Sequence, residues 1–343
     1  MLPNDFQAAH ELCFAIHDLL AKYVIIGERA ELTYYEFELH DVDDHEKLKG
    51  LKGEELWKWC RENGYEHVNT NYAFRHLVFG LVSDMCHFIY EGLQCSRKGK
   101  LSVAFSNLRK PLQDNLFYLE WILADWDDFL VRFRTGPEHL DLNKQIIDVT
   151  AREAKRKQII QKAEDASNVS CGLGSDWHYE VRFKKDSDIG LDPLFNQAIH
   201  LVTTHKHYRT LEENINFIFC NFDDHDSLWG HLYSVLPHIL LHALQVVRAL
   251  FLRIDAEFYP HHKNDNLRLS AGILLWLNHL ESTEQDQVLA NATEIYLNEN
   301  LPACSKCDKP IEASIKNLVR LWKRGMIRCE SCKRNSILFD RNV

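Results

Sequence analysis

The sequence predicts an all-α fold, a multi-helix bundle body followed by a small C-terminal module that also contains a helix. Most segments repeat apolar residues with the period of an α-helix, whereas only residues 177–183 alternate like a convincing β-strand. Hydrophobic residues make up 45% of the 343 residues, so the core can be large. We expect a body over residues 1–299, with a candidate sub-boundary in the loop 167–192, and a module over residues 300–343.

The first half of the body is predicted to consist of successive helices separated by turn-forming residues. The first helix begins after Asn4 or Asp5 and ends near Gly27. Further helices are expected at about residues 54–64, 70–95, 101–133 and 137–166. Pro111 predicts a kink or a restart in the third of these, because proline has no backbone N–H to donate. The basic stretch 152–162 is expected to be exposed.

The second half of the body begins with the longest loop-like stretch, residues 167–192, which contains the strand candidate at 177–183. Asp223 or Asp224 is the expected cap of a very apolar helix, and Ser282 is the expected cap of the last helix of the body. The helices are expected at about residues 193–201, 211–219, 224–254, 267–280 and 284–297.

The helix expected at 224–254 carries a narrow polar line on an otherwise apolar surface. Its members recur at steps of three and four residues, along one side of a helix: Ser227, His231, Ser234, His238, His242, Gln245 and Arg248. The line either faces a cleft, where a histidine is a general acid or base and Arg248 binds an anion, or is the solvated side of the helix. His238 and His242 are also spaced to share a metal ion, without an evident third ligand.

The same segment contains the most membrane-like stretch of the chain, residues 232–254. Its histidines, its arginine and Pro237 would be poorly tolerated by a lipid-facing span, so a buried helix is expected and no membrane partner. Another candidate cluster is Arg109, Gln113 and Glu120, for which a buried Arg–Glu pair joining two helices is favoured over catalysis. No Walker loop, GxGxxG, GxSxG or HExxH motif is present, which removes the commonest nucleotide, hydrolase and metalloprotease assignments.

Four cysteines near the C-terminus have the spacing of a metal site. Cys304 and Cys307 form one CxxC pair, 21 residues follow, and Cys329 and Cys332 form the second pair. Four thiolates from two such turns match the tetrahedral site that zinc prefers, although the gap is slightly longer than usual. Two disulfides or four buried thiols are the alternatives. A structural Zn²⁺ is expected, because four thiolates leave no open position for water.

The segment between the cysteine pairs is predicted to be an amphipathic helix. Ile311, Ile315, Leu318 and Trp322 form its apolar side, and the other side is basic. From Cys304 to the end, ten Lys or Arg face four Asp or Glu, whereas the whole chain carries a formal charge of −10. This basic tail either contacts a polyanion or docks on the acidic body. The candidate nucleic-acid contacts are Lys316, Arg320, Lys323, Arg324, Arg328, Lys333 and Arg334.

The run from Asn107 to Trp121 (NLRKPLQDNLFYLEW) resembles the arginine-led core helix of HEPN-like helical proteins of bacterial defence and toxin systems. The resemblance covers about residues 70–255. It implies a helical core, frequent dimers and, in many members, a metal-independent ribonuclease with an Arg–(four to six residues)–His motif. Arg134 and His139 are the pair with this spacing, although Gly136 and Pro137 interrupt the helix that the motif should occupy.

Three functions follow as hypotheses. The first is a zinc-containing helical protein that binds nucleic acid through its basic module, in a bacterial defence or stress system. The second is an enzyme, a nuclease that uses His238, His242 and Arg248, or Arg134 and His139. The third is a scaffold whose module binds a protein partner or a second copy of the chain. The sequence starts without a signal peptide, which favours the cytoplasm.

Overall fold

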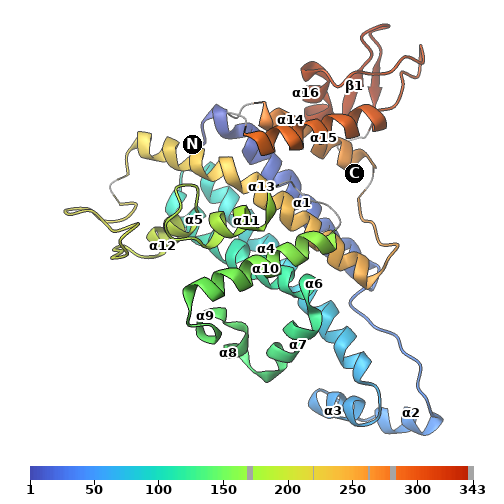
Figure 1. Ribbon diagram of the computed structural model, residues 1–343. Helices are drawn as coiled ribbons and strands as arrows, with labels where there is room; N and C mark the ends of the chain where they lie inside the picture. The colour runs from blue at the N-terminus through green and yellow to red at the C-terminus, as the bar shows by residue number, and fades with distance from the viewer. Residues whose placement is uncertain (168–172, 219, 262, 279–282, 339–343) are drawn as a thin grey trace.

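The protein has an all-α fold, as predicted (Figure 1). The computed structural model describes residues 1–167, 173–218, 220–261, 263–278 and 283–338. The first half contains η1 (Asn4–Phe6), α1 (Gln7–Arg29), α2 (Val42–Leu48), α3 (Glu54–Glu62), α4 (Glu66–Arg97), α5 (Leu101–Lys110), the π-helix η2 (Pro111–Asn115), α6 (Leu116–Ala124), α7 (Trp126–Thr135), α8 (Pro137–Leu140), α9 (Leu142–Gln145) and α10 (Val149–Ser167). The second half contains α11 (Gly174–Phe183), α12 (Asp192–Ile199), α13 (Phe222–Ile254), α14 (Lys263–Leu277), α15 (Glu284–Asn300), α16 (Ile315–Arg324), β1 (Met326–Arg328) and β2 (Asn335–Ile337).

Helix α13 runs through the centre of the body and packs against α1, α6, α10 and α4 (Figure 1). Its N-cap is Asn221, two or three residues before the expected cap, and Asn221 and Asp224 form a reciprocal capping box. Within the described chain, α13 is long and apolar enough to cross a membrane, but 83% of its 18-residue apolar window is buried in the fold. It is therefore a core helix, as the polar residues within it predict.

The strand predicted at 177–183 is wrong, because these residues form the greater part of helix α11. His178 and Arg182 lie on the same side in either geometry, so a short alternating run cannot distinguish a period of two from one of 3.6. The helix is selected by packing, since α11 lies against α10 and buries His178, Tyr179, Val181 and Arg182. Residues 168–172 of the candidate sub-boundary, and the predicted cap Ser282, lie outside the described residues; the N-cap of α15 is Thr283.

The helix expected at 101–133 changes geometry at Pro111, where a kink or a restart is predicted: Pro111 begins the π-helical turn η2 between α5 and α6. The prediction for the segment 137–166 needs correction. The single helix expected at 137–166 is divided into α8, α9 and α10. The basic stretch 152–162 is not fully exposed, because α10 buries Ile159 and Ile160 against its neighbours.

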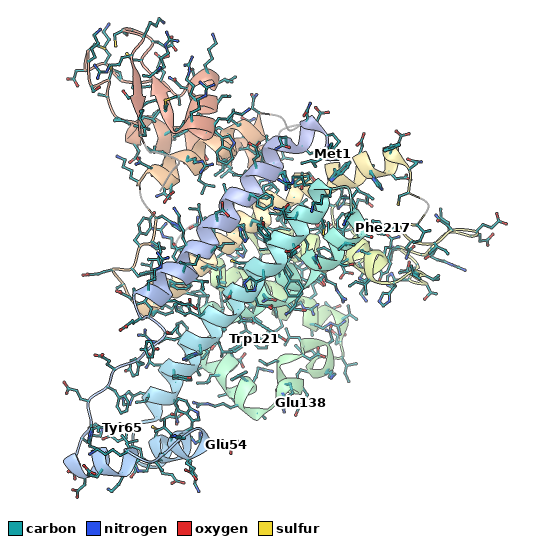
Figure 2. All side chains as sticks on the ribbon, turned by 180° about the vertical axis from the view of Figure 1, so that it is seen from behind. Met1, Glu54, Tyr65, Trp121, Glu138 and Phe217 are labelled. Atoms are coloured by element: carbon teal, nitrogen blue, oxygen red, sulfur yellow. The ribbon has the colours of Figure 1, made fainter. Side chains whose placement is uncertain are left out.

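The two ends of the molecule differ in whether they share the hydrophobic core of the body. Cys60, Tyr65 and Val68 form a small separate core that holds α3 and the preceding segment at one end of α4 (Figure 2). At the other end, the buried residues of the C-terminal segment belong to the same hydrophobic cluster as the body. The strands β1 and β2 pair antiparallel there, with Ile327 opposite Ser336.

Helix α16 is attached to the body mainly through Trp322. The ring of Trp322 lies on Gly272 of α14, where a Cβ atom would be 2.8 Å from its Cε3 atom and closer still to Cζ3. The indole Nε1 donates a hydrogen bond of 2.9 Å to Glu11 of α1. The glycine thus allows close contact between the tail and the body. Arg268 lies over the same indole ring, and Asn264 donates a hydrogen bond to the carbonyl of Leu338.

Replacing Gly272 with alanine should therefore loosen the C-terminal segment. The added methyl group overlaps the Trp322 ring, and overpacking of this kind costs about 1–3 kcal/mol. Chemical denaturation monitored by tryptophan fluorescence would measure the loss. Gly80→Ala in α4 is the matched control, because a Cβ there meets nothing within 4 Å and should be neutral or stabilising. Equal stability of the two variants would contradict the assigned role of Trp322.

Candidate metal centre, basic face and buried histidine cluster

The four cysteines of the C-terminal segment converge on one point. Their sulfur atoms all lie within 4.8 Å of one another. The Sγ atoms of Cys304 and Cys332 are 3.5 Å apart, and those of Cys307 and Cys329 are 3.6 Å apart. A tetrahedron with metal–sulfur bonds of about 2.3 Å separates its sulfurs by about 3.8 Å, whereas a disulfide bond measures about 2.05 Å. The arrangement fits a metal ion and does not fit disulfides.

The two cysteine pairs have matching backbone geometry. Asp308 N–H donates to the carbonyl of Cys304, and Lys333 N–H donates in the same way to Cys329, both at 2.8 Å. Asp308 and Lys333, each four residues after the first cysteine of its pair, have positive φ angles of 54° and 61°. Each pair is therefore a tight turn that directs backbone N–H groups at sulfur. N–H groups of Lys306 and Cys307 lower the pKa of Cys304 to about 6, which favours the thiolate that a metal requires.

Helix α16 positions the second cysteine pair. Gly325 ends the helix in the left-handed conformation (φ 63°), and the chain then turns into β1. The buried side chain of Asn317 donates to the carbonyls of Glu312 and Arg328 and accepts from Arg328 N–H. It ties the helix to both flanking segments, a role that the sequence pattern did not reveal. Ile315 was expected on the apolar side but is 59% exposed at the start of the helix.

The basic residues of α16 lie on the side opposite its packed face, and we call Lys316, Arg320, Lys323 and Arg324 the basic face. Lys316, Lys323 and Arg324 are exposed, whereas Arg320 is half-buried and donates to Asn317. In the described chain, no carboxylate lies within ion-pair distance of these four side chains. The acidic body therefore does not neutralise them directly.

The other three predicted cations surround the second cysteine pair. Arg328 donates to the Lys333 carbonyl, and Lys333 forms an ion pair of 2.8 Å with Glu330. Arg334 is exposed in the turn before β2. Glu330 thus compensates part of the positive charge here, which makes the basic face of α16 the stronger cationic surface.

The polar line of α13 is not a solvated face along its whole length. Ser227 and Ser234 are exposed, but His238 and His242 in the middle are buried, so the solvated-side interpretation is wrong for the two histidines. The middle of the polar line lies in the core because other helices cover α13 there. Arg248, nearly two turns beyond His242, is half-buried over the Tyr259 ring.

His238 and His242 have different partners. His238 Nε2 is 3.1 Å from Asp286 Oδ1, and its ring contacts Trp177 and Trp276. Burial alone would raise the pKa of Asp286, but hydrogen bonds from His238 and Thr283 hold it at about 2. His238 is therefore held in a structural contact between α13 and α15.

His242 belongs to a fully buried ionic network. Its Nε2 is 2.7 Å from Glu120 Oε1, and Arg182 Nη2 donates to both oxygens of Glu120 at 2.7 and 2.9 Å. Although burial would raise the pKa of Glu120, Arg182 and His242 together lower it. The predicted buried Arg–Glu pair thus exists, but its arginine is Arg182. Arg109 instead donates to Gln113 within its own helical segment.

Two further residues complete this cluster, Glu164 of α10 and His178 of α11. Ligand atoms of Glu164, His178 and His242 all lie within 4.8 Å of one another, and the rings of His178 and His242 are 4.0 Å apart. Burial raises the pKa of Glu164 and lowers that of His178, so burial disfavours the charged form of each. The sequence offered no signal for Glu164, which lies just after the basic stretch of α10, and only a nonspecific one for His178.

Arg134 and His139 lie on different elements. Arg134, near the end of α7, forms an ion pair of 2.6 Å with Glu66 of α4. His139 is in α8, and its Nε2 is 3.6 Å from Glu138. Gly136 separates the two helices with a φ of 147°, so the pair does not share a continuous helix.

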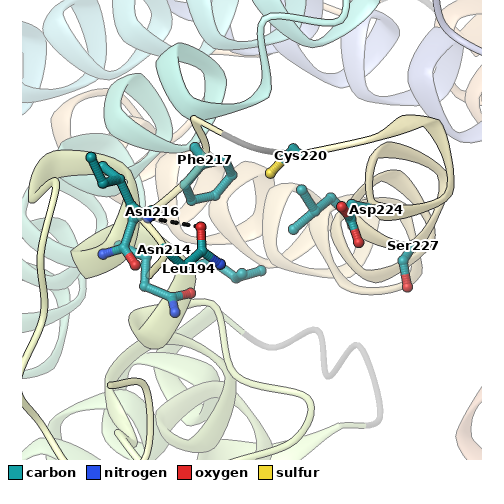
Figure 3. Close-up of a pocket in the computed structure, with 10 residues that line it drawn as sticks. Leu194, Asn214, Asn216, Phe217, Cys220, Asp224 and Ser227 are labelled. Carbon is teal, nitrogen blue, oxygen red and sulfur yellow. Dashed lines mark hydrogen bonds between the residues drawn. The ribbon is translucent and has the colours of Figure 1, made fainter. Parts of the chain in front are cut away.

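Three surface hollows lie elsewhere on the described part of the body. The first, of about 310 Å³, is lined by residues of α12, the segment after it and the start of α13, including Leu194, Asn216 and Asp224 (Figure 3). The second is a larger cleft of about 1010 Å³, where Arg109, Arg156 and other cations are interspersed with aspartates. Arg134 lines a third, more apolar hollow beside α3 and α4.

Taken together, these features describe an all-α protein with a four-cysteine cluster of metal-binding geometry at its C-terminal end. Comparisons of the chain with protein family models, with curated proteins and with solved structures found no match. Function is therefore inferred from the geometry and chemistry of the sites themselves.

Proposed function

We propose that this protein is a zinc-containing helical protein that binds nucleic acid through its C-terminal segment. The observation that carries the proposal is that the two sides of α16 have different contacts. Trp322 and its neighbours pack on the body, whereas the basic face forms no ion pair in the described chain. Lys333 and, less strongly, Arg320 of the basic face lower the pKa of the nearby Glu330. Cations that fastened the tail to the acidic body would instead pair with its carboxylates. The basic face is therefore free to bind an external polyanion.

Zinc is the metal that suits this ligand set. Four thiolates favour a soft or borderline ion, and zinc tolerates the tetrahedral arrangement without electronic preference. Because all four positions are filled by protein sulfur, the ion supports the fold and has no open site for substrate. A four-thiolate site requires reduced cysteines, which persist in a reducing compartment, and we propose the cytoplasm as that compartment.

The basic face is suited to phosphate contacts rather than to base reading. Its four side chains repeat at steps of four, three and one along α16, so they form one stripe of positive charge. Long flexible cations that bind backbone phosphates give affinity with little sequence preference. Arg328, Lys333 and Arg334 extend this surface around the second cysteine pair.

A salt titration of binding to a labelled single-stranded RNA, with a labelled DNA duplex in parallel, tests the proposal. Four phosphate contacts predict a slope of log affinity against log salt of about −3 for the single strand. Lys323→Glu with Arg324→Glu should weaken binding at least tenfold at low salt and reduce the slope by about 1.4. Fluorescence anisotropy measures both quantities.

Lys52→Glu with Lys206→Glu is the matched control, because it changes net charge equally at exposed positions outside the module. The control should keep most of the affinity and the salt slope. Equal weakening by both pairs would show a nonspecific effect of net charge. That result, or absence of binding at low salt, would overturn the proposed function.

A further inference from the structure

Glu164, His178 and His242 form a second group of candidate metal ligands, buried in the body and separate from the four cysteines. Its three residues come from α10, from the next helix α11, and from α13, which is distant from both in the sequence. All three side chains are buried, and His178 has no exposed surface. A carboxylate and two imidazoles are thus brought to one point inside the body.

The cluster contains polar atoms whose hydrogen-bonding capacity is unused. Among the residues that the structure describes, neither ring nitrogen of His178 has a hydrogen-bond partner, and neither does Oε1 of Glu164. The nearest approach between them is 3.5 Å, from His178 Nε2 to Glu164 Oε1. Leaving a buried polar group unsatisfied costs about 1–3 kcal/mol, so three such atoms in one place indicate a missing ligand.

We propose that Glu164, His178 and His242 bind a divalent transition-metal ion of the Zn²⁺ or Fe²⁺ class. Two imidazoles and one carboxylate are the ligand set that such ions use in protein interiors. An ion would bind one ring nitrogen of His178 and Oε1 of Glu164, two of the three atoms without a partner in the described chain, and would join the three helices. Three protein ligands leave at least one coordination position open, in contrast to the cysteine centre.

The surroundings of the cluster support a cation. Glu120 contacts His242 Nε2 and is itself fixed by Arg182, which is the arrangement of a carboxylate that orients a metal-binding histidine. With both carboxylates ionised, Glu120 and Glu164 contribute two negative charges and Arg182 one positive charge. A bound cation would favour the ionised form of Glu164, which burial alone disfavours, and would offset the one negative charge that then remains.

The number of metal ions per chain tests this inference separately from nucleic-acid binding. Full-length protein loaded with Zn²⁺ and then desalted should retain two ions per chain. Cys304→Ser with Cys329→Ser should retain one ion, and so should His178→Gln. His238→Gln is the control, because His238 is buried on α13 like His242 but lies outside the cluster. This variant should retain both ions.

Cobalt provides a readout of the ligand type at each site. In the double cysteine variant, bound Co²⁺ should show weak ligand-field absorption of nitrogen and oxygen ligands, without the intense sulfur charge-transfer bands. Adding Glu164→Gln, which preserves the size of the side chain, should reduce the Co²⁺ affinity at least tenfold while circular dichroism stays unchanged. One ion per chain in the wild type, or no Co²⁺ bound by the folded double cysteine variant, would overturn the second site without affecting the proposed function.

Discussion

Replacing Cys329 with serine should unfold the C-terminal segment while leaving the helical body intact. The segment after α15 contains only the short helix α16 and two three-residue strands, which bury little surface on their own. A structural zinc ion contributes about 10–16 kcal/mol to the folding of comparable small modules. Loss of one thiolate should therefore expose residues 301–338 to limited proteolysis and change the fluorescence of Trp322.

Cys95→Ser is the control for this experiment, because Cys95 is a partly exposed free cysteine outside the cluster. It should keep the protease resistance of the wild type. Chelation of the metal should reproduce the effect of Cys329→Ser, and added Zn²⁺ should reverse it in the wild type alone. An unchanged proteolytic pattern in Cys329→Ser would show that the segment folds without the ion.

The second large effect is expected from Arg182→Met, which leaves the carboxylate of Glu120 buried without its cationic partner. Arg182 and Glu120 are both fully buried, and removing one partner of a buried ion pair costs about 3–5 kcal/mol. Guanidinium denaturation followed by circular dichroism measures the loss. Arg109→Met is the control, because Arg109 donates only to Gln113 and should lose less than about 1.5 kcal/mol.

A double replacement refines this prediction. Arg182→Met combined with Glu120→Leu removes both buried charges, and apolar replacement of a buried pair is often neutral. The double variant should therefore be more stable than Arg182→Met alone. If Arg182→Met costs no more than Arg109→Met, the buried network does not support the packing of α6 and α11.

Local patterns in the sequence predicted most of the fold and the metal centre. Helical periodicity identified the long helices, because a repeating apolar side survives small errors at the ends. The cysteine pairs were recognisable because each is a local motif. Helix α11 was missed because its seven predicted residues fit two periods equally well.

The buried cluster could not be assembled from one sequence. Glu120, Glu164, His178, Arg182 and His242 lie on four helices and share no spacing rule. The Arg–Glu pairing was expected, but the choice of Arg182 over Arg109 depends on how α11 packs across η2 and α6. Whether His238 and His242 face water or the core also depends on which helices cover α13. The periodicity of α13 alone does not predict its neighbours.

The sulfur coordination of the bound ion tests the central claim most directly. Zinc-edge X-ray absorption should be recorded on the His178→Gln variant loaded with one equivalent of Zn²⁺, so that the cysteine centre is measured alone. We predict a single shell of four sulfur atoms at about 2.3 Å. A shell of nitrogen and oxygen at about 2.0–2.1 Å, or the absence of tightly held zinc, would contradict a metal-held C-terminal segment that presents the basic face.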